Sequence, residues 1–446
     1  MNDNLKRWLP WIAVAAVAII VVIIIAVNSG GDDEAADTTT TTTEGETTTT
    51  SEGETTTTSE GETTTTSEAL PEFNAIPVKF GTLLPQTGGL ASIIEALENP
   101  IRMGVDEINA VSDGLVTVEY GDSGTDPNVA SANVDRYLGG DFNGILGAAA
   151  SGVSTSVLDK VQGSQMLMCS GSNTAASLSS SDFNPFYNRT APSDELQGPL
   201  LANVVIEDGF QTVAIAYRND EYGVGFANLL ESTFTSAGAE VVANIGYAPD
   251  ATSFTDVADT IAASGAEALV MITFSEGGQL VLDLQGKYDG AVYVADGFKD
   301  SVGADQLGGN VALLEGFRGT APSASPANGT PGFADRLEAA FPGTPTIFSA
   351  HFYDCLMVQV LAAQAAQSAD PAVYVDQIIP VTGGGEKCTD FGSCFTLLSE
   401  GKDIDYDGAS GPLDFGENGE PAIGTYDVYT YDAEGVANTD TQIVAP

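Results

Sequence analysis

The sequence predicts an α/β fold of two doubly wound parallel-sheet lobes, and three observations carry that prediction. Short runs rich in Val, Ile and Leu alternate with longer runs whose apolar residues recur at helical spacing. Polar and glycine-rich loops separate these runs, and the alternation restarts after Pro192. Strands that alternate with helices form parallel sheets joined by right-handed crossovers. Because the pattern occurs twice, we expect two such lobes.

The predicted elements follow in chain order. In the first round we expect strands at 78–84, 116–120, 145–147 and 165–169, with helices around 101–108, at 129–138 and at 153–161. In the second round we expect strands at 212–217, 240–245, 268–272 and 291–294, with helices at 226–237, 251–264 and 278–284. Ligands of doubly wound sheets bind beyond the carboxyl ends of the strands, so the site is expected in those loops.

Ahead of these lobes the chain opens with an uncharged apolar run from Trp8 to Val27. A helix rises about 1.5 Å per residue, so this run reaches roughly 30 Å, enough to span a bilayer. Lys6 and Arg7 precede it and acids follow from Asp32, which places the N-terminus in the cytoplasm and the rest outside the cell. We expect residues 1–31 to be an uncleaved anchor of a single-pass cell-membrane protein. A cleaved signal peptide is the alternative.

Residues 32–75 are dominated by threonine and glutamate. Three copies of the octet EGETTTTS begin at Glu44, Glu52 and Glu60. These copies have no apolar side chains to bury, so they cannot offset the entropy of ordering, and we expect a disordered stalk. The stalk would hold the lobes away from the membrane. Its hydroxyl density would suit O-glycosylation.

Composition excludes several functions. The net charge is −48 with only 14 Lys and Arg, so nucleic acid is not an expected partner. One histidine, with no GxSxG or HExxH motif, argues against a hydrolase and against a zinc site. We therefore expect no enzyme, no cofactor and no metal. The segment from Asp403 to Asp414 imitates a calcium loop, but Pro412 interrupts it and no amphipathic helices flank it.

The four cysteines fall into two pairs. Cys388 and Cys394 flank a short polar loop, and an exterior compartment allows disulfides, so we expect a bridge between them. Cys169 ends an apolar strand and Cys355 lies inside an apolar helix. We interpret both as small buried hydrophobic residues.

Four loops after predicted strands carry candidate binding groups. The loop 149–153 places Ser151 and Gly152 at a helix start, where backbone N–H groups and the helix dipole suit a carboxylate. The loop 170–174 is rich in donors: Ser172, Asn173 and Thr174. The turn 219–225 carries Tyr222, and Asp296 follows the strand at 291–294, where it suits an ammonium group. Each loop alone is equally consistent with a cap or turn, but together they describe a cleft for a zwitterion.

The segments VKFGTLLPQTGGL, MGVDEIN, NPFYNRTAPSDELQG, NDEYGVGFAN and GPLDFGENGEPAIGTYDVY resemble those of type I periplasmic binding proteins. The leucine/isoleucine/valine-binding group that serves ABC importers is the most similar, over Ile76 to Pro446. The resemblance implies a two-lobed clamshell with three crossovers that closes on its ligand. It places 76–192 plus 321–411 in the first lobe, and 193–320 plus 412–446 in the second.

The resemblance also implies roles for single residues. Ser151 matches the serine that bonds the ligand carboxylate, and the loop 172–174 matches the small-small-Thr segment with an apparent one-residue insertion. Tyr222 and Phe274 match aromatic residues of the second lobe, and Asp296 matches an acid that receives the ligand's amino group. Ile93 departs from the family, where many members have Tyr, so the side-chain pocket differs.

The expected function is therefore an extracellular solute-binding protein. It would capture a small amino-acid-like ligand, with branched-chain amino acids as the implied class, for an ABC permease and its ATPase. Two alternatives stay open: a ligand-sensing ectodomain that signals through a partner, and a binder of amides, urea or small organic acids.

Overall fold

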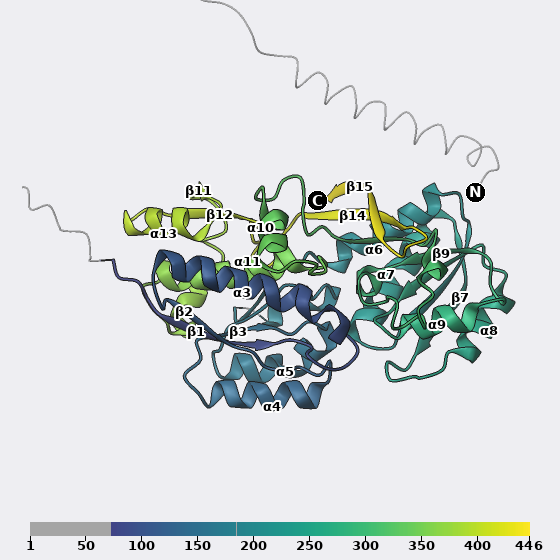
Figure 1. Cartoon of the computed structure of the whole chain (residues 1–446), viewed down its shortest axis with the longest axis horizontal. Coiled ribbons are helices and arrows are strands. Elements are labelled where there is room, and N and C mark those ends of the chain that lie inside the picture. The colour runs from purple at the N-terminus through teal and green to yellow at the C-terminus, as the bar shows by residue number, and fades with distance from the viewer. Residues whose placement is uncertain (1–72, 184) are drawn as a thin grey trace, which may run out of the picture. The chain divides into compact units, whose positions relative to one another are not determined.

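Two main β-sheets, each covered by helices on both faces, organise residues 73–183 and 185–446, which are the residues that this computed structural model describes (Figure 1). All of them lie within one compact unit. The expected anchor and nearly all of the expected stalk lie outside the described residues. In the described part of the chain, no helix combines the length and apolarity needed to cross a membrane.

The first sheet is parallel throughout, with the strand order β2-β1-β3-β4-β5. Its strands are β1 (Val78–Leu83), β2 (Val116–Glu119), β3 (Gly144–Gly147), β4 (Met168–Ser170) and β5 (Tyr187–Arg189). The helices α4 (Pro127–Leu138) and α5 (Ser151–Gly163) cover one face, and α3 (Ile94–Val111) and α11 (Ser349–Ala365) pack together on the other (Figure 1). We call this body the first lobe.

The second sheet has the order β15-β14-β10-β9-β8-β6-β7. Five strands run parallel: β6 (Thr212–Arg218), β7 (Glu240–Tyr247), β8 (Ala268–Ile272), β9 (Ala291–Val294) and β10 (Arg318–Pro322). The last two strands are β14 (Gly424–Tyr431) and β15 (Ala437–Ala445). Strand β14 pairs antiparallel with both β10 and β15, so the sheet is mixed. Its helices are α6 (Asp194–Glu207), α7 (Glu221–Ala237), α8 (Thr255–Ser264) and α9 (Gly277–Leu284). We call this body the second lobe.

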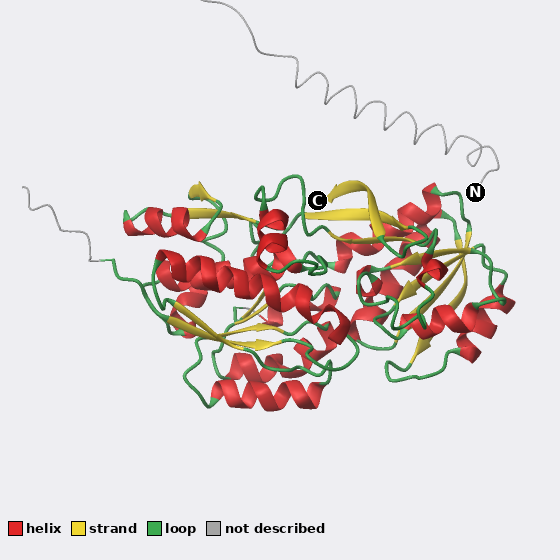
Figure 2. Cartoon of the chain, viewed as in Figure 1, coloured by secondary structure: helices red, strands yellow, loops and turns green. Residues whose placement is uncertain are grey.

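A third, small sheet lies beside the first lobe. It contains β11 (Glu386–Cys388), β12 (Ile404–Gly408) and β13 (Gly411–Pro412). The remaining helices are α10 (Phe333–Ala340), α12 (Pro371–Tyr374) and α13 (Phe391–Ser399). Figure 2 shows helices above and below the strands in both lobes, which is the layering that alternating strands and helices predict.

Local sequence explains where several helices begin. Asp126 caps α4 by accepting from the N–H groups of Asn128 and Val129, and Pro127 takes the first helical position, where no N–H is needed. Asp220 caps α7 through the N–H of Gly223, and Gly238 ends that helix with a left-handed φ of 85°. These caps direct the start of each helix toward the carboxyl ends of the strands.

The predicted alternation of strands and helices is confirmed, and most boundaries lie within four residues of the predicted ones. Residues 268–272 and 291–294 match β8 and β9 in full, whereas the helix predicted from Phe226 begins at Glu221. The division of whole residue ranges between the lobes stays a prediction.

Two disulfides join the four cysteines. The predicted bridge between Cys388 and Cys394 is present. Cys169 and Cys355 are fully buried, as expected, but the interpretation as separate hydrophobic residues is wrong, because they are bonded to each other. Their separation of 186 residues hid this pairing, since only the fold brings β4 against α11.

Candidate functional site

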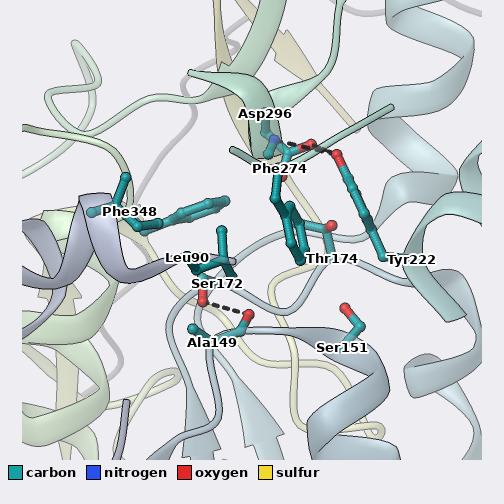
Figure 3. A pocket seen from close by; sticks show the side chains of 11 residues that line it. Leu90, Ala149, Ser151, Ser172, Thr174, Tyr222, Phe274, Asp296 and Phe348 are labelled. Atoms are coloured by element: carbon teal, nitrogen blue, oxygen red, sulfur yellow. Dashed lines mark hydrogen bonds between the residues drawn. The ribbon is translucent and has the colours of Figure 1, made fainter. Parts of the chain in front are cut away.

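A pocket lies where the carboxyl ends of strands from both lobes face each other (Figure 3). About 350 Å³ of space free of protein atoms, open solvent included, lies between its walls. Its walls are formed by Leu90, Ile93, Ala149, Ser151, Ser172, Thr174, Tyr222, Phe274, Asp296, Gly297 and Phe348. Six of the eight predicted ligand-binding residues therefore line one cavity.

The first lobe supplies hydroxyl groups to this pocket. Ser151 is the first residue of α5, so its side chain sits beside backbone N–H groups at the positive end of a helix. Its hydroxyl accepts only a long hydrogen bond, 3.4 Å, from the N–H of Ala175. Ser151 and Thr174 point into the cavity (Figure 3). This end of the pocket suits a carboxylate.

The donor loop, residues 170–174, is held by its own side chains. Ser172 donates to the carbonyl of Ala149 at 2.9 Å (Figure 3), and Ser170 donates to that of Ala148 at 2.7 Å. Asn173 is fully buried and donates to both carbonyls. The amide of Asn173 therefore fixes the loop, and its role toward a ligand stays a prediction.

The second lobe supplies a stacked aromatic wall. The rings of Tyr222 and Phe274 lie 5.6 Å apart at an angle of 17°. The guanidinium of Arg218 covers Phe274, 3.6 Å from the ring centroid, and is itself paired with Asp220 and Glu276. The first residues of α7 and the loop after β8 carry these rings, so both belong to strand-to-helix turns.

Asp296 closes the other end of the pocket, opposite Ser151 (Figure 3). It follows β9, is 3% exposed, and accepts hydrogen bonds from the Tyr222 hydroxyl at 2.8 Å and the Gln197 amide at 3.1 Å. Burial raises the pKa of Asp296 to about 6, against the opposing effect of these hydrogen bonds. The described residues give its carboxylate no cationic partner, so an incoming ammonium group would supply one.

A second carboxyl group, that of Asp194, lies close to Asp296. Asp194 is the first residue of α6 and is fully buried, and its carboxylate oxygens have no partner at full hydrogen-bond geometry, although the Thr174 side chain lies near enough to act against the rise of its pKa. Burial and then the charge of Asp296 raise its pKa well above the usual value. Sequence reasoning missed Asp194, because an acid at a helix start is ordinarily explained by the helix dipole. Its position two residues after Pro192, where the second round begins, was the available signal.

Between these polar ends the wall is apolar. Leu90, Ile93 and Phe348 are each at most 4% exposed and line the cavity. Phe348 precedes α11 and adopts a left-handed backbone with φ of 58°. Its ring extends into the pocket toward Phe274 (Figure 3). Such a wall suits an aliphatic side chain and would leave a charged one without a partner.

Gly152, the remaining predicted residue, lies outside this lining. It borders a neighbouring cleft between the lobes, together with Thr125, Arg218 and Glu221. A ligand contact for Gly152 stays a prediction.

The two lobes touch beside the pocket. The hydroxyl of Ser275 donates to the carbonyl of Gly89 at 2.7 Å, and that of Ser92 donates to the carbonyl of Ser301 at 3.1 Å. The N–H of Ile347 donates to Asp300 at 3.2 Å. These hydrogen bonds hold the two lobes together beside the pocket.

The calcium-like segment has a different role. Within it, Asp405 and Asp407 both lie 2.9 Å from the ammonium group of Lys387. The lysine therefore takes the position of a cation between these carboxylates.

Comparisons with known proteins agree with this geometry. A family model described as "Periplasmic binding protein" matches residues 77–436. The chain is 27% identical to BasB of Halobacterium salinarum, a substrate-binding protein of a chemotactic signal transduction system, over 78% of this chain and 86% of the relative. LivJ of Streptococcus pneumoniae, solved with isoleucine, is 18% identical with a TM-score of 0.69, covering 83% of this chain and 100% of LivJ. An R. palustris solute-binding protein solved with benzoate is 15% identical with a TM-score of 0.68, covering 82% and 96%. The two structures show the fold alone.

Two α/β lobes that enclose a small cavity between their strand ends define a ligand-binding protein. With the family model matching most of its length, the chain belongs to the periplasmic binding proteins, and its two-lobed fold is that of type I members. The resemblance drawn from the sequence is thereby confirmed. The family consists of extracellular binding proteins rather than enzymes.

Proposed function

We propose that this protein captures a small aliphatic amino acid outside the cell and delivers it to an ABC permease and its ATPase. The apolar run at 8–27 would anchor it in the cell membrane, and the stalk at 32–75 would hold the two lobes away from the membrane surface. The lobes would close over the ligand, and the closed form would be the one that the permease engages.

One observation carries the ligand class: the pocket has opposite chemistry at its two ends. A hydroxyl and a helix start at Ser151 suit a carboxylate. The buried carboxyl group of Asp296, which has that of Asp194 close to it, suits an ammonium group. The apolar wall between them suits an aliphatic side chain. An organic acid without an amino group would leave both carboxyls unmatched.

The test is a ligand panel on the purified full-length protein. Leucine, isoleucine, valine and alanine are expected to raise the melting temperature, because a ligand at about 100 times its Kd stabilises by about 2.7 kcal/mol. Aspartate, urea and benzoate are the controls and are expected to leave it unchanged. Stabilisation by benzoate and by no amino acid would contradict the proposal.

Binding of an amino acid is expected to weaken as the pH falls. Asp296 has a pKa of about 6 in the free protein, and a bound ammonium group requires its ionised form. Below pH 6 each ligand must therefore displace a proton, and the Kd is expected to rise about tenfold per pH unit. Calorimetric titration between pH 7 and 5, in two buffers of different ionisation enthalpy, measures both the Kd and the released proton. A Kd that stays constant over this range would exclude Asp296 as the ammonium partner.

A second candidate function is ligand sensing. The similarity to BasB supports it, because BasB is the substrate-binding protein of a chemotactic signal transduction system. Deletion of the gene distinguishes the two. Loss of uptake of a labelled amino acid with intact chemotaxis would support transport, and the reverse would support sensing.

A further inference from the structure

The disulfide between Cys169 and Cys355 lies directly behind the ligand pocket. Cys169 is in β4, and the residue after it begins the donor loop. Cys355 is in α11, about two helical turns from Phe348, which forms the opposing wall. The bond therefore joins the element that carries the donor hydroxyls to the element that carries the aromatic wall.

Other contacts at this junction are close but not covalent. The backbone of Gly171 lies against α11 so tightly that an added Cβ would come within 2.6 Å of the backbone nitrogen of Phe352. The hydroxyl of Thr190 donates to the carbonyl of His351 at 2.7 Å. Without the disulfide, packing would hold the donor loop against the helix, and the Thr190 hydrogen bond would hold the neighbouring end of β5.

We propose that the Cys169–Cys355 disulfide is a positioning element of the ligand pocket, which fixes the donor loop at a set distance from Phe348. The inference rests on the proposed function, since the loop and the ring are taken as opposite walls of one ligand site. A ligand would meet a cavity whose width is already set. The free energy of binding would then not be reduced by the cost of ordering the wall.

The alternative is that the disulfide only stabilises the fold as a covalent cross-link, which we call a staple. A bond that closes a loop of 186 residues restricts the unfolded chain strongly, and on that account alone its loss lowers stability. A staple of this kind acts on the unfolded state and leaves the Kd of the folded protein unchanged. The chain offers a matched control, because the Cys388–Cys394 bridge lies in the β11–α13 region and neither residue lines the pocket.

The experiment compares two double variants of the full-length protein, C169A/C355A and C388A/C394A. We measure the Kd for leucine and alanine well below the melting temperature. The pocket variant is expected to bind leucine about tenfold more weakly, the cost of ordering one or two wall side chains, whereas the control stays within twofold. Its preference for leucine over alanine is expected to fall as well, because the wall no longer has a fixed position.

Two further measurements keep the inference testable. Hydrogen exchange on the ligand-free proteins is expected to be faster at residues 170–175 in C169A/C355A than in the control. If that variant does not fold, Thr190→Val removes the hydrogen bond at the same junction with the disulfide intact, and a few-fold loss of leucine affinity is expected. An unchanged Kd and unchanged exchange would leave the bridge a staple only. Failure of the wild type to bind any amino acid would instead contradict the proposed function, while the exchange comparison would still decide this inference.

Discussion

Replacing Asp194 by Asn is expected to stabilise the ligand-free protein at pH 7 and to weaken its binding of an amino acid. The carboxyl group is fully buried, its oxygens have no partner at full hydrogen-bond geometry, and the Thr174 side chain offsets only part of the cost of burial. In the unfolded chain it is ionised at pH 7, so folding must either bury a charge or take up a proton, and both cost free energy. Asn has the same size and no charge. We expect the free energy of unfolding to rise by about 2 kcal/mol.

The gain in stability is expected to depend on pH in a definite direction. The pKa of Asp194 is raised in the folded state, so its unfavourable contribution is absent below the unfolded value of 3.8 and grows as the pH rises above it. Urea unfolding at pH 7 and at pH 3 measures this, and the difference between D194N and wild type should vanish at pH 3. Asp135, which is 64% exposed, provides the control, since D135N is expected to change stability by less than about 1 kcal/mol.

The same substitution removes a carboxyl group beside Asp296 that can lose its proton when an ammonium group binds. A loss of about 2 kcal/mol corresponds to a Kd about 30 times higher. Opposite effects on stability and affinity would identify Asp194 as a residue kept for function. A variant that is less stable than the wild type at pH 7, or that binds as tightly, would contradict this view of the site.

Much of the fold could be predicted because its signals are local. A strand such as β8 is a continuous apolar run that is buried over its whole length, and a helix such as α4 has a cap and apolar spacing that can be read within twelve residues. The antiparallel addition of β14 and β15 to the second sheet could not be predicted in this way. Pairing of β10 with β14 joins residues more than a hundred positions apart, and spacing along the chain carries no signal of it.

The site divides in the same way. Ser151, Tyr222 and Asp296 follow predicted strands, so the rule that ligands bind at strand ends found them. Phe348 and Asp194 lie at helix starts that no predicted strand precedes directly. Only the folded chain brings Phe348 into the pocket wall and Asp194 close to Asp296. The Cys169–Cys355 pairing is likewise a property of tertiary structure.

Arg189 shows how far such long-range contacts reach. It is fully buried at the end of β5, and its Nε donates to Glu420 at 2.5 Å. Its Nη1 donates to the carbonyls of Asn173 and Ala175, which flank Thr174, at 3.1 and 2.9 Å. One guanidinium group therefore contacts both the donor loop and the segment that leads into β14. The same side chain thus stabilises the ligand site and one of the crossovers between the lobes.

Substitution of Arg189 by Met is expected to cause the largest loss of stability, about 3–5 kcal/mol, because Glu420 would remain buried without its cation and two carbonyls would lose their donor. Thermal unfolding should show a melting temperature lower by roughly 5 °C. Arg102, whose side chain is 42% exposed and pairs with Glu98, is the control, and R102M is expected to cost less than about 1 kcal/mol.

The double variant R189M/E420Q separates the charge effect from the geometry. It removes the unpaired carboxylate, so part of the lost stability should return, while the donor loop stays without its clamp and ligand affinity stays low. A double variant that regains both stability and affinity would show that the guanidinium acts only by neutralising Glu420. An R189M protein as stable as R102M would show that it does neither.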